Sequence, residues 1–158
     1  MKTKKIIVFT PLIILLTMSC SDRNVYQKYI KIPDYIWHFE NEVSFSVNIT
    51  DTTSLHDIFL NLRIASMYPY SNIWLKKRII DEKNEVIFET IQEFILADDR
   101  GKWIGEGLGD IIDYQFPINE SFQFKAKGTY NFVFSHEMRV ENLTAVMDLG
   151  LLVKKSKD

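Results

Sequence analysis

Cys20 is the residue whose type and position point most directly to chemistry. It is the single cysteine of the 158-residue chain, so no disulfide can form within the chain. A basic start, an apolar run and the small residue Ser19 precede it, which is the order of a secretory signal peptide. Bacterial lipoproteins are cleaved directly before such a cysteine, and the cysteine is then acylated. We therefore predict a signal peptide over 1–19 and a lipid on Cys20.

The apolar run before Cys20 is short. It covers about 13 residues, Ile6–Met18, whereas a helix needs roughly 20 to cross a bilayer, so a permanent spanning helix is not expected. The cleavage motif departs from the usual pattern, which has leucine three positions before the cysteine, because Thr17 stands there and Leu16 comes before it. The alternative is an ordinary cleaved signal followed by a chance cysteine.

A glycine-rich segment, Gly101–Asp110, has the composition of a phosphate-binding loop but not its order. A dinucleotide fingerprint beginning at Gly105 would need a third glycine where Asp110 stands, and a helix after it. A P-loop using Gly101 and Lys102 fails because position 96 is leucine and position 103 is tryptophan. We expect a structured surface loop that presents a binding surface or stabilises the fold. Its candidate residues are Trp103, Gly105, Gly107 and Asp110.

The sequence contains no motif for catalysis, for a metal or for a cofactor. The three histidines lie in different segments: His38, His56 and His136. A zinc-protease motif starting at His136 lacks its second histidine, because Val140 stands in that place. We therefore predict a protein that is not an enzyme and that uses no metal or cofactor.

Charged residues near or inside apolar segments have less obvious roles. The run Lys76–Arg78 is expected on the solvated side of a strand or as protection of a sheet edge. Arg63 and Arg139 each lie in a strongly apolar segment. A guanidinium in such a place either pairs with an acceptor or extends its charged end to solvent, and both alternatives stay open.

Composition indicates one small exported domain. Removal of 1–19 leaves 139 residues, enough for one compact domain. Loss of the three signal-peptide lysines takes the formal net charge from −2 to about −5. A weakly acidic chain is not expected to bind nucleic acid, because nucleic-acid binders present dense basic patches. A hydrophobic content of 46%, with 13% aromatic residues, is sufficient for a packed core.

Alternating hydrophobic residues predict the elements that hold these groups. The stretch 42–49 alternates without error, 58–65 and 73–80 follow, and 122–124, 130–134 and 144–154 read as further strands. The stretch 85–97 fits a helix or a strand, and its β-branched and aromatic content favours a strand. A helical turn is expected over 137–143. Seven or eight strands predict a single antiparallel β-sandwich or jelly roll over 31–158, after a tether at 20–30.

Three blocks of the sequence carry a family resemblance. They are Leu62-Arg63 leading into 68–75 (YPYSNIWL), 96–110 (LADDRGKWIGEGLGD), and 128–151 with its GTY, MR and DLGL elements. With the lipoprotein signal, these blocks resemble the GldH gliding-motility lipoproteins of the Bacteroidetes over 24–155. The resemblance implies an outer-envelope lipoprotein needed for gliding and associated with surface-protein secretion, with no enzymatic activity. Only Cys20 carries over as a functional residue, and non-gliding members also occur.

Two functions of different classes follow. The first is a non-enzymatic envelope component, held by its lipid in the outer membrane, that binds envelope proteins. The alternative is a lipid-anchored carbohydrate-binding module, for which Trp37, Trp74 and Trp103 are the candidate platform. Tryptophans clustered on one exposed face would favour sugar binding, and dispersed or buried ones would favour the first function.

Thr52 is a candidate modification site. Asp51-Thr52-Thr53 resembles the short sequence at which Bacteroidetes attach O-glycans to exported proteins, and it is expected in an exposed turn. The alternative is a turn held only by hydrogen bonds from Asp51.

Overall fold

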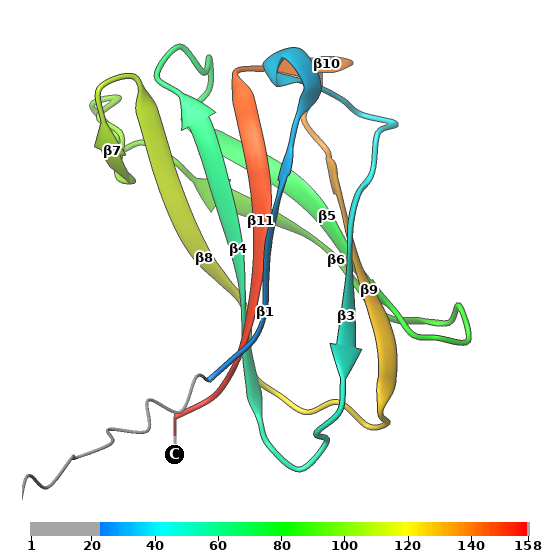
Figure 1. Cartoon of the computed structure of the whole chain (residues 1–158). Coiled ribbons are helices and arrows are strands. Elements are labelled where there is room, and N and C mark those ends of the chain that lie inside the picture. The colour runs from blue at the N-terminus through cyan, green and yellow to red at the C-terminus, as the bar shows by residue number, and fades with distance from the viewer. Residues whose placement is uncertain (1–22, 158) are drawn as a thin grey trace, which may run out of the picture.

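The computed structural model describes residues 23–157, so Cys20 and the predicted signal peptide lie outside the described residues (Figure 1). Regular structure in this range is β-strand, apart from the short 3-10 turn η1 (Pro33–Tyr35). The strands are β1 (Asn24–Lys31), β2 (Ile36–His38), β3 (Val43–Ile49), β4 (His56–Ala65), β5 (Asn72–Ile80), β6 (Val86–Ile95), β7 (Glu106–Leu108), β8 (Ile111–Phe122), β9 (Gly128–His136), β10 (Asn142–Thr144) and β11 (Val146–Lys155). The prediction of an all-β fold is confirmed.

Two antiparallel sheets face each other and enclose the core. The five-stranded sheet has the order β1-β11-β4-β8-β7, and the four-stranded sheet has the order β3-β9-β5-β6. Strands β2 and β10 form a small separate pair. The largest fully buried side chains lie between the sheets and include Trp37, Phe45, Phe132 and Phe134. This is the antiparallel sandwich that the sequence predicts.

Strand β3 shows how the sequence pattern produces this arrangement. Its residues alternate strictly between buried and exposed, beginning with Val43, which is buried. β3 pairs with β9, and Phe45 meets Phe134 edge to face with 6.0 Å between ring centroids. Successive side chains of a strand point to opposite faces, so a period of two makes one face apolar and the other solvated.

The strand directions place the connections at two opposite ends. Strand β1 begins beside the last residues of β11, so the first and last described residues meet at one end (Figure 1). We call this the lower end; it also carries the turns 50–55, 81–85 and 123–127. We call the opposite end the upper end; it carries the connections 32–42, 66–71, 96–110 and 137–145.

Strand β1 corrects the predicted boundary between tether and domain. The predicted tether, 20–30, overlaps β1, which pairs with β11 from Asn24↔Lys154 to Lys31↔Asp148. The sandwich therefore begins at residue 24 rather than 31. The register shifts between Asn24 and Tyr26, so the apolar residues of this strand do not alternate regularly. That irregularity hides the strand in the sequence.

Three local predictions are wrong. The described residues form eleven strands rather than seven or eight, because β2, β7 and β10 have only three residues each. The helical turn expected over 137–143 is absent from this irregular stretch, which instead enters β10 with Leu143 buried. Phe124 does not continue the strand of Phe122, since β8 ends at Phe122. The Phe124 ring instead packs against Tyr130, with 4.7 Å between centroids.

Candidate functional site

The predicted loop around Trp103 is well structured. Asp98 organises its first turn, since Asp98 Oδ1 accepts hydrogen bonds from the backbone N–H groups of Arg100 and Lys102, both at 2.9 Å. Gly101 has a positive φ of 78° in this turn, a conformation that favours glycine. Trp103 forms a bridge with Ala97, and its half-buried ring lies 6.4 Å from the ring of Tyr68.

The other glycines of this loop allow close backbone packing. A Cβ atom at Gly105 would lie 2.6 Å from the carbonyl oxygen of Asp113, and one at Gly107 would collide with the carbonyl of Ile111. Asp110 closes the hairpin between β7 and β8 and accepts a hydrogen bond from the backbone N–H of Ser66 at 2.8 Å. These glycines therefore let β7 and the residues before it approach β8, which is a structural role.

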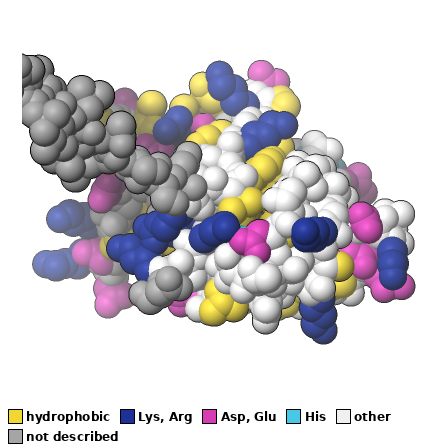
Figure 2. Space-filling model, turned by 60° about the horizontal axis from the view of Figure 1, so that its bottom comes forward, with side chains coloured by type: hydrophobic (Ala, Val, Ile, Leu, Met, Phe, Trp, Pro, Cys, Tyr) yellow, Lys and Arg dark blue, Asp and Glu magenta, His cyan; other side chains and the backbone are white. Residues whose placement is uncertain are grey.

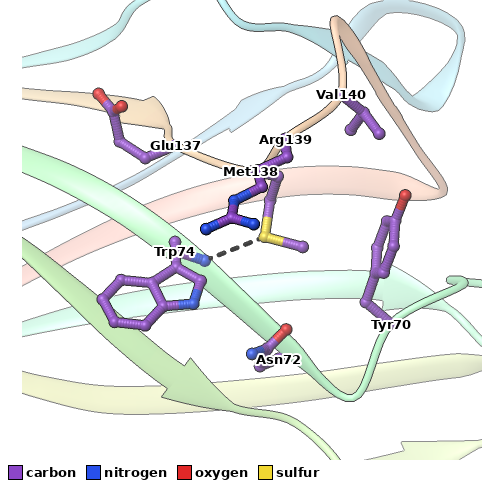
Figure 3. Close-up of a pocket in the computed structure, with 7 residues that line it drawn as sticks. All are labelled: Tyr70, Asn72, Trp74, Glu137, Met138, Arg139 and Val140. Atoms are coloured by element: carbon purple, nitrogen blue, oxygen red, sulfur yellow. Dashed lines mark hydrogen bonds between the residues drawn. The ribbon is translucent and has the colours of Figure 1, made fainter.

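A groove opens beside Trp74 at the upper end (Figure 3). Two segments line it: the start of β5 with the residues before it, and the residues after β9. We call it the Trp74 groove; its volume is about 550 Å³ and its lining residues are Tyr70, Asn72, Trp74, Glu137, Met138, Arg139 and Val140. Figure 3 shows the Arg139 guanidinium pointing from the upper segment toward the Trp74 side of the groove.

The groove forms because strand pairing ends at this point. β5 and β9 pair up to Leu75↔His136, and the last contact is the backbone N–H of Glu137 donating to the carbonyl of Trp74 at 2.8 Å. The chain then leaves the sheet to form β10. The backbone N–H of Trp74, left without a strand partner, donates to Met138 Sδ at 3.3 Å. Because the start of β5 and the residues after β9 no longer pair here, they move apart, and their side chains line an open groove.

The three sequence blocks that carry the family resemblance meet around this groove. Two of them line it, since 68–75 supplies Tyr70 to Trp74 and 128–151 supplies Glu137 to Val140. The third block joins the first, because the backbone N–H groups of Leu96 and Ala97 donate to the carbonyl of Ser71 at 2.7 and 3.0 Å. Parts of all three blocks therefore lie at the upper end, although the block 128–151 also contains β9 and runs into β11.

The residue types in the Trp74 groove are suited to binding a ligand. Trp74 is 40% exposed, and Arg139 is exposed beside it. Arg139 forms no ion pair with any residue in the described range. The groove contains no serine, cysteine or histidine that could act as a nucleophile or base. It offers an aromatic ring, a thioether and an unpaired cation to a ligand.

A second groove lies on the outer face of the five-stranded sheet. It has a volume of about 630 Å³, and Gly105 of the predicted loop lies in its wall. Arg63 lies in it and donates from Nε to Asp113 Oδ1 at 2.7 Å, while Nη1 reaches Asp148 Oδ2 at 3.5 Å. The bond to Asp113 raises the pKa of Arg63, and burial raises the pKa of Asp148. Of the two alternatives for Arg63, the structure shows pairing.

Lys77 is the buried charge that sequence reasoning missed. The run Lys76–Arg78 was expected to be solvated, yet Lys77 is only 4% exposed. It points between the sheets, where Nζ donates to Gln92 Oε1 at 2.7 Å and to the carbonyl of Ile118 at 3.2 Å. Burial lowers its pKa to about 8. The period of two in β5 was the available signal, because Ile73, Leu75, Lys77 and Ile79 share one face.

The tryptophans do not form one platform. Trp37 is buried in the core, where its Nε1 donates to the carbonyl of Asn41 at 2.7 Å. Trp103 is half-buried, and only Trp74 is exposed. The histidines are equally dispersed. Among residues 23–157 no group of three potential ligands could hold a metal ion.

The two predicted modification sites belong to the lower end or the chain before it. Thr52 lies in the turn 50–55, where its backbone carbonyl accepts a hydrogen bond from Gln123 Nε2 at 3.3 Å. Asp51 organises this turn through bonds to Thr53 and Ser54. Cys20 lies outside the described residues, four positions before the first residue of β1. No helix within the described range is long and apolar enough to cross a membrane.

Comparison with known proteins gives a consistent family match. The family model described as GldH lipoprotein matches residues 24–153. The chain is 30% identical to the Gliding motility lipoprotein GldH homolog of Christiangramia forsetii, covering 96% of this chain and 94% of that protein. It is 26% identical to the Gliding motility lipoprotein GldH of Flavobacterium johnsoniae, covering 89% and 91%.

Solved structures resemble the chain much less. Those of the infectious bursal disease virus Gx strain and of the VP2 subviral particle of that virus each match with a TM-score of 0.34 and 13% identity. The first covers 85% of this chain and 33% of its own, and the second covers 82% and 33%. These scores are too low to show a shared fold.

Proposed function

We propose that this chain, which belongs to the GldH lipoprotein family, acts in gliding motility through protein contacts made at its upper end. Membership makes it a gliding-motility lipoprotein, held in the cell envelope by a lipid anchor. Family and relatives are named for motility rather than for an enzymatic reaction. The finer parts of the proposal are acylation at Cys20, location in the outer membrane and a role as a component of the gliding and surface-protein secretion machinery.

The observation that carries the proposal is the opposite placement of anchor and groove. Cys20 lies four residues before β1, whose first residue is at the lower end. The segments that line the Trp74 groove, the start of β5 and the residues after β9, lie at the upper end (Figure 1). Strands such as β4, with 10 residues, separate the ends by about 30 Å at ~3.3 Å per residue. A lipid at Cys20 would keep the lower end at the membrane and leave the groove accessible.

The residue types in the groove support a protein ligand. Tyr, Trp, Met and Arg are enriched at protein interfaces, and Trp, Tyr and Arg supply most binding hot spots. Trp74, Arg139 and Met138 are such residues, and they are brought together from two segments far apart in the sequence. The dispersed tryptophans also favour this function over the carbohydrate-binding alternative.

Affinity capture of the lipidated protein from native membranes tests the proposal. Trp74→Ala and Arg139→Ala should each remove gliding or secretion proteins that co-purify with the wild type, because these side chains line the groove. Both residues are exposed, so the variants should fold. Tyr29→Ala is the matched control, since Tyr29 is 47% exposed on the outer face of the other sheet. The same co-purifying proteins with Trp74→Ala as with the wild type would contradict the proposal.

A further inference from the structure

Strand β6 is a long edge strand that pairs on one side only. It ends the order β3-β9-β5-β6 and pairs with β5 from Asn72↔Ile95 to Ile80↔Val86. No other described strand pairs with it, and no further backbone hydrogen bond from 86–95 is formed in the described range. A row of its backbone N–H and C=O groups therefore faces outward, which is a template for another strand.

The solvent-facing side of β6 alternates isoleucine with glutamate. Ile87, Ile91 and Ile95 are 46%, 51% and 50% exposed. Glu89 and Glu93 lie between them on the same face and are also exposed. The opposite face turns inward, where Phe94 is buried. Three exposed isoleucines at every fourth position are unfavourable in water, because removing apolar surface from water is stabilising.

The other edge of the same sheet shows what an edge without a partner looks like. The solvent-facing residues of β3 are Ser44, Ser46 and Asn48, all exposed and all polar. Neither edge strand contains proline or lysine, so the two edges differ in their solvent-facing residues, which are all polar on β3 and alternate isoleucine with glutamate on β6. The contrast indicates that β6, unlike β3, is built to be covered.

A second copy of the chain does not fit this edge. Antiparallel pairing of two β6 strands that aligns Ile91 with Ile91 also aligns Ile87 with Ile95, and it then places Glu89 opposite Glu93. Like charges directly opposite each other destabilise a strand pair. A shift by two residues on the same face removes that repulsion, but it places isoleucine opposite glutamate. Pairing of two β6 strands therefore either places like charges opposite each other or loses the contacts between isoleucines.

We propose that β6 binds, by strand addition, an extended segment of a partner protein in which apolar residues alternate with Lys or Arg. Such a segment places apolar residues opposite the isoleucines and cations opposite Glu89 and Glu93. Glu93 faces Trp74 across the β5–β6 pair, accepts a hydrogen bond from the Asn72 amide and forms no ion pair within residues 23–157. Glu89 lies opposite Arg78, which itself bonds to Glu42, and Glu89 Oε1 lies 3.6 Å from Lys76 Nζ.

The position of the edge connects it with the Trp74 groove. The last three pairs of the β5–β6 ladder include Trp74↔Glu93 and Asn72↔Ile95, and both Trp74 and Asn72 line the groove. A segment added along β6 would therefore end beside the groove. The inference rests on the proposed function, because it names the kind of partner that this part of the molecule contacts.

The test uses a synthetic peptide in which isoleucine and lysine occupy alternate outward positions, with threonine at the inward ones. The mature protein should bind it and gain amide-exchange protection in 86–95. A peptide with glutamate in place of lysine should bind about tenfold more weakly, because two attractive cross-strand pairs become repulsive. Equal binding of both peptides, or protection confined to other strands, would overturn the proposal.

Charge reversal on the protein sharpens the result. The double variant Glu89→Lys with Glu93→Lys should prefer the glutamate peptide, whereas Ser44→Lys with Ser46→Lys on β3 should keep the wild-type preference. If the protein is a dimer at the assay concentration and Ile91→Lys makes it monomeric, then a second copy of the chain occupies β6 and the proposal is overturned. The peptide assay does not depend on the Trp74 groove. If the protein prefers the lysine peptide while Trp74→Ala still captures the same proteins as the wild type, only the proposed function is contradicted.

Discussion

The lower end of the sandwich carries a cluster of paired polar side chains, whereas the most exposed apolar side chains of residues 23–157 lie at the upper end. At the lower end Lys155 Nζ lies 2.6 Å from Asp51 Oδ2, and Ser156 Oγ donates to Asp57 Oδ1 at 2.6 Å. The bond from Lys155, followed by those from Thr53 and Ser54, holds the pKa of Asp51 well below its usual range. Figure 2 shows patches of Lys and Arg side chains at this end, together with Asp and Glu and a band of hydrophobic side chains.

The upper end also contains ion pairs, such as His38–Glu141, but it exposes apolar side chains more strongly. Leu108 is 92% exposed, Met67 is 80% exposed and Ile104 is 57% exposed, all in its connections. The Trp74 groove lies in the same region. Exposed apolar side chains gathered in one region commonly mark a contact surface. This difference between the ends is consistent with the proposed division of the sandwich, with the lipid anchor at one end and partner contacts at the other.

The largest effect on the protein's location is expected from Cys20→Ala, which removes the proposed anchor of the lower end. Buried acyl chains contribute about 0.8 kcal/mol per CH₂, so their loss should release the protein from the membrane or leave it mislocalised. Fractionation with detergent-phase partitioning measures this, and Ser21→Ala is the control. A Cys20→Ala protein of mature size that still partitions wholly into detergent would show that the anchor lies elsewhere.

Phe45→Ala tests whether the two ends share one core. Phe45 is fully buried in the middle of β3, so its truncation should cost about 3–5 kcal/mol of the free energy of unfolding. That is a large part of a total of about 5–15 kcal/mol. Chemical denaturation should show one cooperative transition at lower denaturant, with Ser44→Ala close to wild type. Separate unfolding transitions would show that the two ends do not share one cooperative core. An unchanged denaturation midpoint would show that Phe45 does not contribute to the core.

Lys77 provides a pH test of the interior between the ends. Its folded-state pKa of about 8 lies below the ordinary value of about 10.4, so the unfolded chain binds more protons between these pH values. Stability should therefore rise with pH across this window, by an amount on the order of 1–3 kcal/mol relative to Lys77→Met. Denaturation of both proteins at several pH values measures the difference. Parallel profiles would mean that Lys77 is not buried.

The smallest effect on stability is expected at Thr52. A glycan at Thr52 would cover part of the lower end and leave the upper end as the more accessible surface for partners. Intact mass of the native protein should exceed that of polypeptide plus acyl chains, and Thr52→Ala should remove the excess while Thr53→Ala retains it. The free energy of unfolding should change by less than about 0.5 kcal/mol, because the turn is held by Asp51. A mass equal to that of the polypeptide plus its acyl chains would show that no glycan is attached.

The regular parts of the fold could be predicted because their information is local. β3 and β4 alternate clearly, and β11 is apolar enough for a strand between two neighbours. β1 could not be predicted, since its register shift disrupts the alternation and its pairing partner, β11, lies at the other end of the chain. Lys77 was missed because its charge was read without regard to the face it shares with Leu75 and Ile79.

The candidate site was only partly predictable. The sequence singles out Trp74 and Arg139, but the groove exists because pairing of β5 with β9 stops at Leu75↔His136. That stop depends on contacts between segments about 60 residues apart, which no local pattern encodes. The loop 101–110 is structured as expected, yet its glycines serve close packing on β8. The binding role proposed for this loop stays a prediction.

Site-specific photo-crosslinking in native membranes tests the central claim most directly. A photoreactive amino acid in place of Trp74 samples the upper end, and one in place of Lys127 samples the lower end of the same lipidated protein. The account predicts crosslinks to an envelope protein from position 74 and none to protein from position 127. Crosslinks to protein from position 127 alone would contradict it, because partners would then bind at the membrane-facing end.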